Sequence, residues 1–235
     1  MKKILLFLSL ISSSLIFSQL PKSLLTPIEK TYTYDEYEGS IYMKGRYKES
    51  SVIDEKSGTY DTKLKYNILT DALEYTSNSE LFEITKSAKI HARIDGDYFY
   101  YCNFETQRGM ERDGYYILVE LTDNYRIYKK YTLKITDPEP KKMVQAGTPE
   151  PGRLRTIITY LIEENGIIME LPMKKKDFLA TFSDKEDELK QYLKKESIRF
   201  KKEEDLIRLV ARYNALKNAD ATPSQSLLSN RGRNN

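Results

Sequence analysis

The stretch KIHARIDGDYFYYCNF, residues 89–104, decides the class of fold. Apolar and polar residues alternate from 89 to 94, which is the period of a half-buried β-strand. Asp95-Gly96 follows, and a two-residue hairpin turn favours this dipeptide because both positions need a positive φ. The stretch therefore predicts an antiparallel hairpin whose second strand is 98–104. One face of that second strand is expected to carry the side chains of Tyr98, Tyr100, Cys102 and Phe104.

The same pattern continues on both sides of this hairpin. Further strands are expected at 41–46, 60–68, 72–76, 81–85, 115–121, 125–135 and 156–163. Turn residues lie between them at Lys56-Ser57-Gly58, Thr70-Asp71, Asp123-Asn124 and Asn165-Gly166. Turn signals that recur every ~8–12 residues indicate an antiparallel meander. We therefore expect a mainly β fold over 40–172, closed as a barrel, partial barrel or sandwich.

The flanking segments have other patterns. Residues 19–39 predict an extended lead-in. Residues 137–153 hold four of the eight prolines and predict a long loop. After Pro172 the apolar period becomes helical, so a small C-terminal helical cap is expected over 173–217.

Local signals divide that cap into helices. Ser183 and Glu186 have the spacing of a capping box, which predicts a helix start. A last helix is expected at 203–216, with acidic residues at its start as the helix dipole favours. Residues 218–235 are polar and rich in Asn and Ser, and we expect them to be disordered.

The N-terminus has the pattern of a secretion signal. Lys2 and Lys3 precede an apolar stretch over 4–16, and Ser18 supplies a small residue at the boundary. We expect cleavage between Ser18 and Gln19, giving a secreted or periplasmic protein. An uncleaved anchor or a buried N-terminal strand is the alternative, but the stretch is shorter than the ~20 residues of a membrane span. No cysteine lies near the cut, which disfavours a lipoprotein.

Composition restricts the class of protein further. Removal of 18 residues from 235 leaves 217, and loss of Lys2 and Lys3 lowers the net charge from +3 to +1. This balance, with export, argues against nucleic acid as a partner. The chain has 19 tyrosines and no tryptophan, which suits strands with one packed and one wet face. The single Cys102 excludes an intramolecular disulfide, and no membrane span is expected in the mature chain.

No catalytic, cofactor-binding or metal-binding residue can be assigned from the sequence. His91 is the sole histidine, and its strand position predicts an exposed sheet face rather than a catalytic base. Cys102 is most simply a small buried hydrophobe, because no partner that would lower its pKa can be assigned. We therefore expect a protein without a cofactor or a bound metal.

Carboxylates are the only numerous reactive groups. A glycan hydrolase would need two of them ~5–10 Å apart in a cleft. The sequence pairs are Asp95 with Asp97 and Glu163 with Glu164. A loose calcium-like acidic run comprises Asp35, Glu36 and Glu38, but it lacks the spacing of a defined site. Two basic clusters, Lys174-Lys175-Lys176 and Lys201-Lys202, are most simply solvated helix ends.

Several motifs resemble those of a large, uncharacterised family of secreted Bacteroidota proteins. The segment LKYNILTDALE, residues 64–74, is similar to the family's LRYN-x-x-x-D-x-hydrophobic-E motif. The C-terminal segments LPMKKKDFL at 171–179, FSDK at 182–185 and KEEDLI at 202–207 are similar too. The resemblance implies an envelope protein with a β domain and a C-terminal helical segment. It implies no activity and no site residues.

Two classes of function remain. The first is a non-catalytic binding or protein-interaction module of the envelope, with an envelope protein or an apolar ligand as partner. An apolar ligand would lie in a partial barrel between tyrosine-rich strands. The second is a carboxylate-dependent hydrolase of envelope glycans.

Overall fold

The structure, a computed structural model, describes residues 20–29, 34–138 and 150–219. It divides into two compact units, one ending at Met169 and one beginning at Glu170. The predicted signal, residues 1–18, lies outside the described residues, as do 139–149 of the predicted loop and 220–235 of the predicted tail. Among the described residues, no helix combines the length and apolar character needed to cross a membrane.

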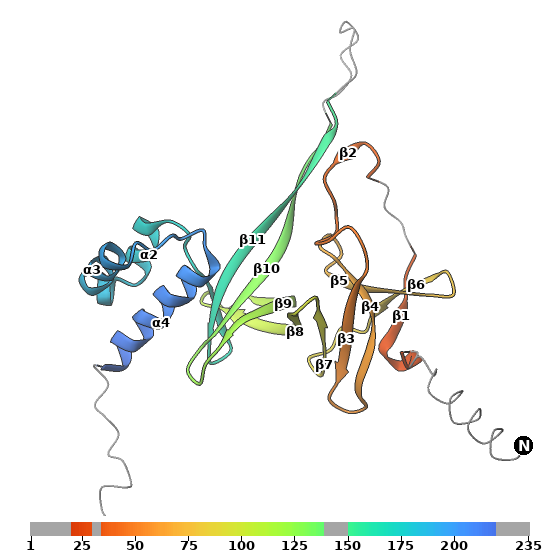
Figure 1. Cartoon of the computed structure of the whole chain (residues 1–235), viewed down its shortest axis with the longest axis horizontal. Coiled ribbons are helices and arrows are strands. Elements are labelled where there is room, and N and C mark those ends of the chain that lie inside the picture. The colour runs from red at the N-terminus through yellow and green to blue at the C-terminus, as the bar shows by residue number, and fades with distance from the viewer. Residues whose placement is uncertain (1–19, 30–33, 139–149, 220–235) are drawn as a thin grey trace, which may run out of the picture. The chain divides into compact units, whose positions relative to one another are not determined.

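The first unit is built on one large sheet (Figure 1). Its strands are β1 (Leu25–Pro27), β2 (Tyr37–Glu38), β3 (Lys48–Asp54), β4 (Gly58–Asn67), β5 (Ala72–Ser77), β6 (Glu80–Ile84), β7 (Ile90–Ile94), β8 (Asp97–Thr106), β9 (Glu111–Leu121), β10 (Arg126–Thr136), β11 (Gly152–Glu164) and β12 (Ile167–Glu170). The strand order is β1-β6-β5-β4-β3-β7-β8-β12-β11-β10-β9, with a further β8–β9 pairing. The predicted mainly β fold is thus confirmed. Neighbours pair antiparallel except at two short parallel contacts, β2 with β11 and β12 with β8.

The hairpin turns follow the predicted dipeptides. Asp95 and Gly96 have φ angles of 53° and 94° between β7 and β8. Asn165 and Gly166 have φ angles of 54° and 82° between β11 and β12. Positive φ at both central residues is what a two-residue turn between twisted strands requires, so both predicted hairpins are confirmed.

Strands β8 to β12 form a ring with a filled interior. The ring closes where β12 pairs with β8 through Ile167–Glu105 and Ile168–Thr106. Its core consists of the buried side chains Phe104, Tyr116, Tyr128 and Ile168, with Cys102, Leu118 and Leu161 packed against them. The Phe104 ring lies 5.0 Å from that of Tyr116 and 5.3 Å from that of Tyr128, between centroids. Such aromatic contacts leave the interior occupied by protein side chains.

The ring strands also contribute to a second core on their other face. Phe99, Tyr115 and Ile117 alternate with the ring residues and join the main core. That core includes Val52 and Leu64 from the neighbouring strands. The expectation of one packed and one wet face is therefore wrong for β8 and β9, whose tyrosine-rich runs face two cores.

The predicted strand at 41–46 is wrong. The chain there makes a single bridge, Tyr42 with Asn67, and the strand that pairs with β4 is β3. Ile41 and Met43 still contact the end of β4, where Ile68 donates its N–H to the Ile41 carbonyl oxygen at 2.8 Å. The alternation of apolar and polar residues predicted a strand here, but the segment makes only this isolated bridge and no ladder.

The second unit is helical, with α2 (Lys175–Thr181), the short 3-10 helix η3 (Ser183–Lys185), α3 (Glu186–Glu196) and α4 (Glu203–Ala219). The predicted capping box is wrong, because Ser183 belongs to the 3-10 turn and Lys185 precedes α3 without a capping side chain. At the next helix, α4, Asp205 lies in the first turn. Its carboxylate accepts the Arg199 backbone N–H at 3.1 Å, and this hydrogen bond lowers the pKa of Asp205.

The predicted lead-in is more structured than expected. Residues 20–29 hold the 3-10 helix η2 (Lys22–Leu24) and β1, and β2 lies further along the chain. Leu20 and Leu24 are buried in the main core. This short segment therefore belongs to the body of the first unit, and it supplies part of the pocket described next.

Candidate functional site

The candidate site lies on the face shared by β1, β6 and β5. Directly paired residues of antiparallel strands point to the same side of a sheet. Pro27 pairs with Phe82, and Phe82 pairs with Tyr75, so the three side chains form one row across the strands. The Tyr75 and Phe82 ring centroids lie 6.4 Å apart. This row continues the core face of the sheet beyond the buried core itself.

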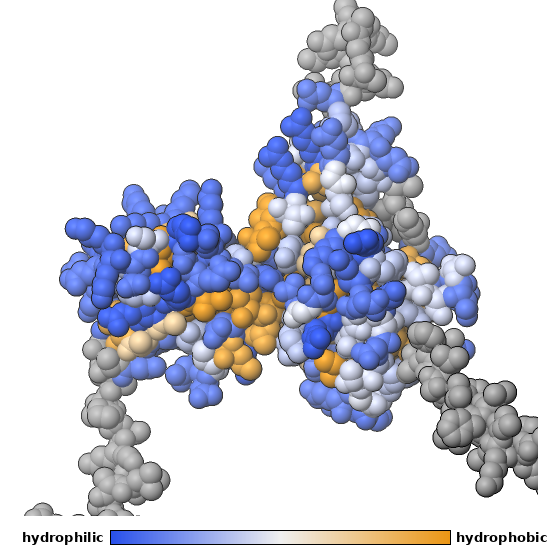
Figure 2. All heavy atoms as spheres, viewed as in Figure 1, coloured by the Kyte–Doolittle hydropathy of each residue, from blue (hydrophilic) through white to orange (hydrophobic). Residues whose placement is uncertain are grey.

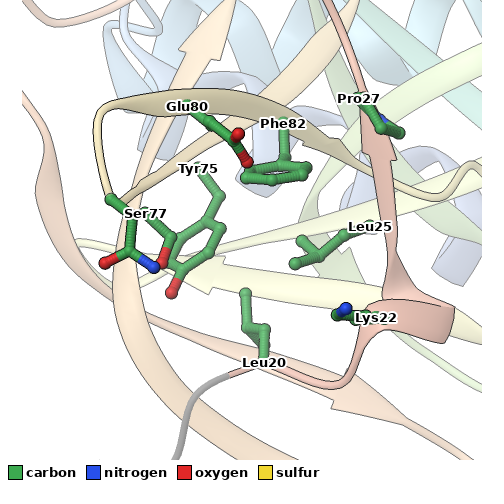
Figure 3. A pocket seen from close by; sticks show the side chains of 9 residues that line it. Leu20, Lys22, Leu25, Pro27, Tyr75, Ser77, Glu80 and Phe82 are labelled. Carbon is green, nitrogen blue, oxygen red and sulfur yellow. The ribbon is translucent and has the colours of Figure 1, made fainter.

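A pocket of about 500 Å³ opens over this row. Figure 3 shows Leu20 and Leu25 on one side of it, facing Tyr75 and Phe82. Leu20 is buried, whereas Tyr75 and Phe82 keep part of their rings exposed. The volume lies in the range that holds a small ligand. The walls therefore offer an aromatic and aliphatic surface that is already formed.

Polar groups surround the outer end of the pocket. Ser77 and Glu80 pair across the β5–β6 hairpin, and Asn78 stands at its turn with a φ of 50°. Lys22 approaches from the segment before β1. An apolar floor with a few polar groups at the rim suits an amphipathic ligand, because the floor takes its flat apolar part and the rim its hydrogen-bonding groups.

A second constellation, centred on Asp71, lies inside the first unit. Asp71 accepts hydrogen bonds from the Tyr66 hydroxyl at 2.6 Å and from the Tyr115 backbone N–H at 3.1 Å. Lys130 Nζ lies 3.4 Å from the same carboxylate. Burial and the neighbouring Asp71 charge raise the pKa of Tyr66. The carboxylate therefore joins the β4–β5 turn to β9 and β10.

Gly114 makes this arrangement sterically feasible. Its φ is +139°, and a Cβ there would lie 2.2 Å from Lys130 Nζ and 2.3 Å from Asp71 Oδ2. The space of a side chain is thus taken by the ion pair. The Tyr115 hydroxyl is buried nearby without a hydrogen-bond partner among the described residues. Burial raises the pKa of Tyr115, so its phenol stays protonated and is a poor nucleophile.

The residues of the 64–74 motif stabilise the β4–β5 turn. Asn67 accepts the backbone N–H groups of Leu69 and Thr70 and donates its amide N–H to Glu74 at 2.7 Å. Glu74 is buried, and its charge helps raise the pKa of Tyr42 after burial itself. The motif therefore encodes a turn and its buried support. None of its residues belongs to the lining of the pocket described above.

His91 and Cys102 each pack against aromatic side chains. His91 is half-buried rather than fully exposed, and its ring stacks on Tyr100 at 4.9 Å between centroids. Burial lowers the pKa of His91. Cys102 is half-buried against the ring core, and burial raises the pKa of its thiol to about 11. A thiol in this environment is protonated and unreactive at neutral pH.

The predicted carboxylate pairs serve ion pairs and turns. Asp95 forms a salt bridge with Lys44, and the Lys44 contact lowers the pKa of Asp95. Asp97 lies 3.2 Å from Lys129. Glu163 is buried beside Arg126 at 3.0 Å and accepts the Gly166 backbone N–H at 2.6 Å, which closes the β11–β12 turn. Glu164 lies on β11 next to it.

The remaining charged candidates are spread over the surface. Asp35 and Glu36 are exposed in the turn before β2, and Glu38 lies in that strand. The clusters Lys174-Lys175-Lys176 and Lys201-Lys202 are exposed in the helical unit. Within 20–29, 34–138 and 150–219, no three side chains of the His, Cys, Asp or Glu type gather as metal ligands would.

The sequence did not reveal the pocket, because its walls come from segments that are distant along the chain. Leu20 and Lys22 were assigned to an extended lead-in, and Tyr75 and Phe82 to separate short strands. One signal was available: Leu20, Leu24 and Leu25 form an apolar group too dense for a solvated lead-in.

Comparison with known proteins gives no relative for this chain. No protein-family profile, curated protein or solved structure matches it. The geometry of the site is therefore the basis for inferring what the chain binds.

Proposed function

We propose that this chain is an exported envelope protein that acts as a non-catalytic binding module. The observation that carries the proposal is the row of Pro27, Phe82 and Tyr75 beneath an open pocket with a polar rim. The ligand expected there is a small amphipathic molecule with a flat apolar part. The N-terminal pattern and the resemblance to secreted Bacteroidota proteins support the envelope as its location.

The arrangement of reactive groups supports binding rather than catalysis. Asp95, Asp97 and Glu163 each contact a basic side chain, and the Cys102 thiol has a raised pKa. A glycan hydrolase requires two carboxylates facing one cleft, whereas Glu80 is the sole carboxylate among the pocket's lining residues. The pocket thus has the surface of a binding site and lacks the acid pair of a hydrolase.

The location of the pocket also changes the form of the carrier hypothesis. The ring of β8–β12 is filled by Phe104, Tyr116 and Tyr128, which occupy the space an apolar ligand would need. The open aromatic surface lies instead on β1, β5 and β6. An apolar ligand carrier would therefore use this outer face and not the interior of the ring.

A single tryptophan can report on the pocket, because the chain has none of its own. The variant Phe82→Trp places an indole in the floor of the pocket with little change in chemistry. Titration with an extract of envelope lipids and glycans, followed by single purified compounds, is expected to shift its fluorescence maximum and to saturate. The matched control is Tyr98→Trp, an exposed position on β8 outside the pocket. The proposal fails if both indoles respond alike, or if neither responds to any fraction.

Export is tested separately from binding. Expression of the full chain in a Bacteroidota host, followed by N-terminal sequencing, is expected to give a mature start at Gln19 in the envelope fraction. A cytoplasmic protein that retains Met1 would refute export and leave the pocket titration unaffected.

A further inference from the structure

The apolar floor of the pocket on β1, β6 and β5 is small. Pro27, Phe82 and Tyr75 lie opposite one another on these three strands, and neighbouring strands are ~4.8 Å apart, so the floor is about 10 Å across. Along β6 the same face holds Glu80 on one side of Phe82 and the buried Ile84 on the other. Each is two residues away, or ~7 Å along the strand. The floor therefore measures about 10 Å by ~7 Å before it meets polar or buried side chains.

These dimensions favour a ring over an extended lipid chain. The hydrocarbon core of a bilayer is ~30 Å thick, so one acyl chain extends over about 15 Å. A chain of that length would project beyond the floor in every direction. A six-membered sugar ring, with bonds of ~1.5 Å, is smaller than the floor and can lie flat on it.

The rim of the pocket carries both hydrogen-bond donors and acceptors. Lys22 donates, Glu80 accepts, and Ser77 and Asn78 can do both. Figure 2 shows hydrophilic residues at the end of the β5–β6 hairpin, where three of these side chains lie. With the rest of the described chain, none of the four forms a side-chain hydrogen bond or ion pair. These groups are therefore available to a ligand.

The charges of the rim favour a neutral ligand. Lys22 and Glu80 are the two ionised side chains of the lining, and their charges cancel. An anionic ligand would be repelled by Glu80 and a cationic one by Lys22. A hydroxyl group both donates and accepts, so a neutral polyol can bind the ammonium and the carboxylate at once.

A sugar ring combines the two kinds of surface that the pocket offers. The C–H groups on one face of the ring are apolar and slightly positive, whereas the face of an aromatic ring is negative. They can therefore pack on Phe82 and Tyr75. The hydroxyls project from the edge of the ring, and a planar carboxylate or amide such as Glu80 or Asn78 can hold two neighbouring hydroxyls.

We propose that the pocket binds a neutral hexopyranose ring, either as a free sugar or as the end of a glycan chain. The ring packs on Phe82 and Tyr75, and Glu80 and Asn78 bind its hydroxyls. This inference rests on the proposed function and specifies the class of its ligand. Because Glu80 is the sole carboxylate of the lining, the sugar is bound and not cleaved.

Saturation-transfer NMR on the full-length protein tests the class of ligand. The probes are the methyl glycosides of glucose, galactose, mannose and N-acetylglucosamine, with a lysophospholipid below its micellar concentration as the lipid probe. After irradiation of the aromatic protons of the protein, at least one glycoside is expected to receive saturation. The transfer should be strongest at the C–H protons on one face of its ring, because these protons lie on the aromatic floor.

Matched variants locate the bound sugar. Phe82→Ala should abolish the transfer, whereas Tyr98→Ala, which removes an exposed ring outside the pocket, should leave it unchanged. Glu80→Ala should raise the dissociation constant about tenfold or more, the effect of losing a hydrogen bond to a charged group. Glu49→Ala removes a carboxylate that is 82% exposed and outside the lining, and should have no effect.

The outcomes separate this inference from the proposed function. Transfer to the lysophospholipid and to no glycoside would overturn the sugar as ligand and leave a binding pocket. Transfer to neither class of probe would overturn both. Equal effects of Phe82→Ala and Tyr98→Ala, or of Glu80→Ala and Glu49→Ala, would place the sugar outside this pocket and overturn the assignment. A trisaccharide of the bound sugar distinguishes the two sources, since tighter binding than the glycoside indicates a glycan chain and equal binding a free sugar.

Discussion

Aromatic side chains line both the ring of β8–β12 and the face of β1, β6 and β5, but they are covered differently. In the ring, Phe104 packs against Tyr116 and Tyr128 and is 8% exposed. On the outer face, Tyr75 and Phe82 are direct cross-strand partners with ring centroids 6.4 Å apart, yet the adjoining side is a pocket. Aromatic rings contact one another in both places. Whether an aromatic row becomes a core or a binding surface depends on which distant strand reaches it.

The largest expected difference between the two regions is in stability. Phe104→Ala should lower the free energy of unfolding by about 3–5 kcal/mol, because it opens a cavity in a filled core. Phe82→Ala removes a ring that is already partly exposed and should lower it by about 1 kcal/mol. Urea unfolding followed by tyrosine circular dichroism measures both. Similar losses for the two variants would contradict the distinction between closed core and open pocket.

A side chain added at Gly114 should have the next largest effect on stability. Gly114→Ala combines a strained φ with displacement of the Asp71–Lys130 pair, and should lower the free energy of unfolding by about 2–4 kcal/mol. Gly58→Ala is the matched control, because Gly58 has a φ of +103° and no atom within 4 Å of the added Cβ. It should show the backbone term alone, about 1 kcal/mol. Equal losses of unfolding free energy in urea would mean that Asp71 and Lys130 can move aside without any cost in stability.

Thiol chemistry can probe the closure of the ring without a change in stability. The pKa of Cys102 is raised from 9.0 to about 11, so its thiolate at pH 8 is about 100-fold scarcer than for an ordinary thiol. Iodoacetamide should therefore alkylate Cys102 about 100-fold more slowly than Ser77→Cys at the pocket rim, measured in a Cys102→Ser background. Comparable rates, read by mass spectrometry, would show that the ring opens readily.

The smallest expected effect concerns pH. The Tyr101 hydroxyl donates to Asp113 at 2.7 Å and lowers the pKa of that carboxyl below its usual range. Stability from this contact is therefore present above the ordinary aspartate pKa of about 4 and is lost as pH falls through the lowered folded value. Tyr101→Phe should return the Asp113 pKa toward 4, as seen by carboxyl NMR titration. An unchanged titration curve would show that the hydroxyl does not act on Asp113.

Local chemistry explains which parts of the fold were predictable. Asp95-Gly96 and Asn165-Gly166 specify their turns by the φ that each residue tolerates, so neighbouring strands followed from sequence alone. The helix at Glu203–Ala219 was predicted for a similar reason, from apolar residues at helical spacing. These features depend on residues that are close along the chain.

Features that depend on distant pairing were not predictable. Ring closure joins Ile168 of β12 to Thr106 of β8, and no local signal marks either residue as a partner. The strand predicted at 41–46 is absent, because this segment makes only a single bridge between Tyr42 and Asn67. The strand that pairs with β4 is Lys48–Asp54. The pocket was missed for the same reason, since Leu20 and Phe82 come together only after the sheet has formed.

The contacts of Asp71 also set an order of events in folding. Its hydrogen bond from Tyr115 spans 44 residues, and its contact with Lys130 spans 59. Contacts of such sequence separation form late, because a long loop must close first. The β4–β5 turn is made from neighbouring residues, but it gains these partners only when β9 and β10 join the sheet. The first half of the sheet is therefore complete only after the second half has folded. Until then its exposed apolar strands are prone to association with other chains.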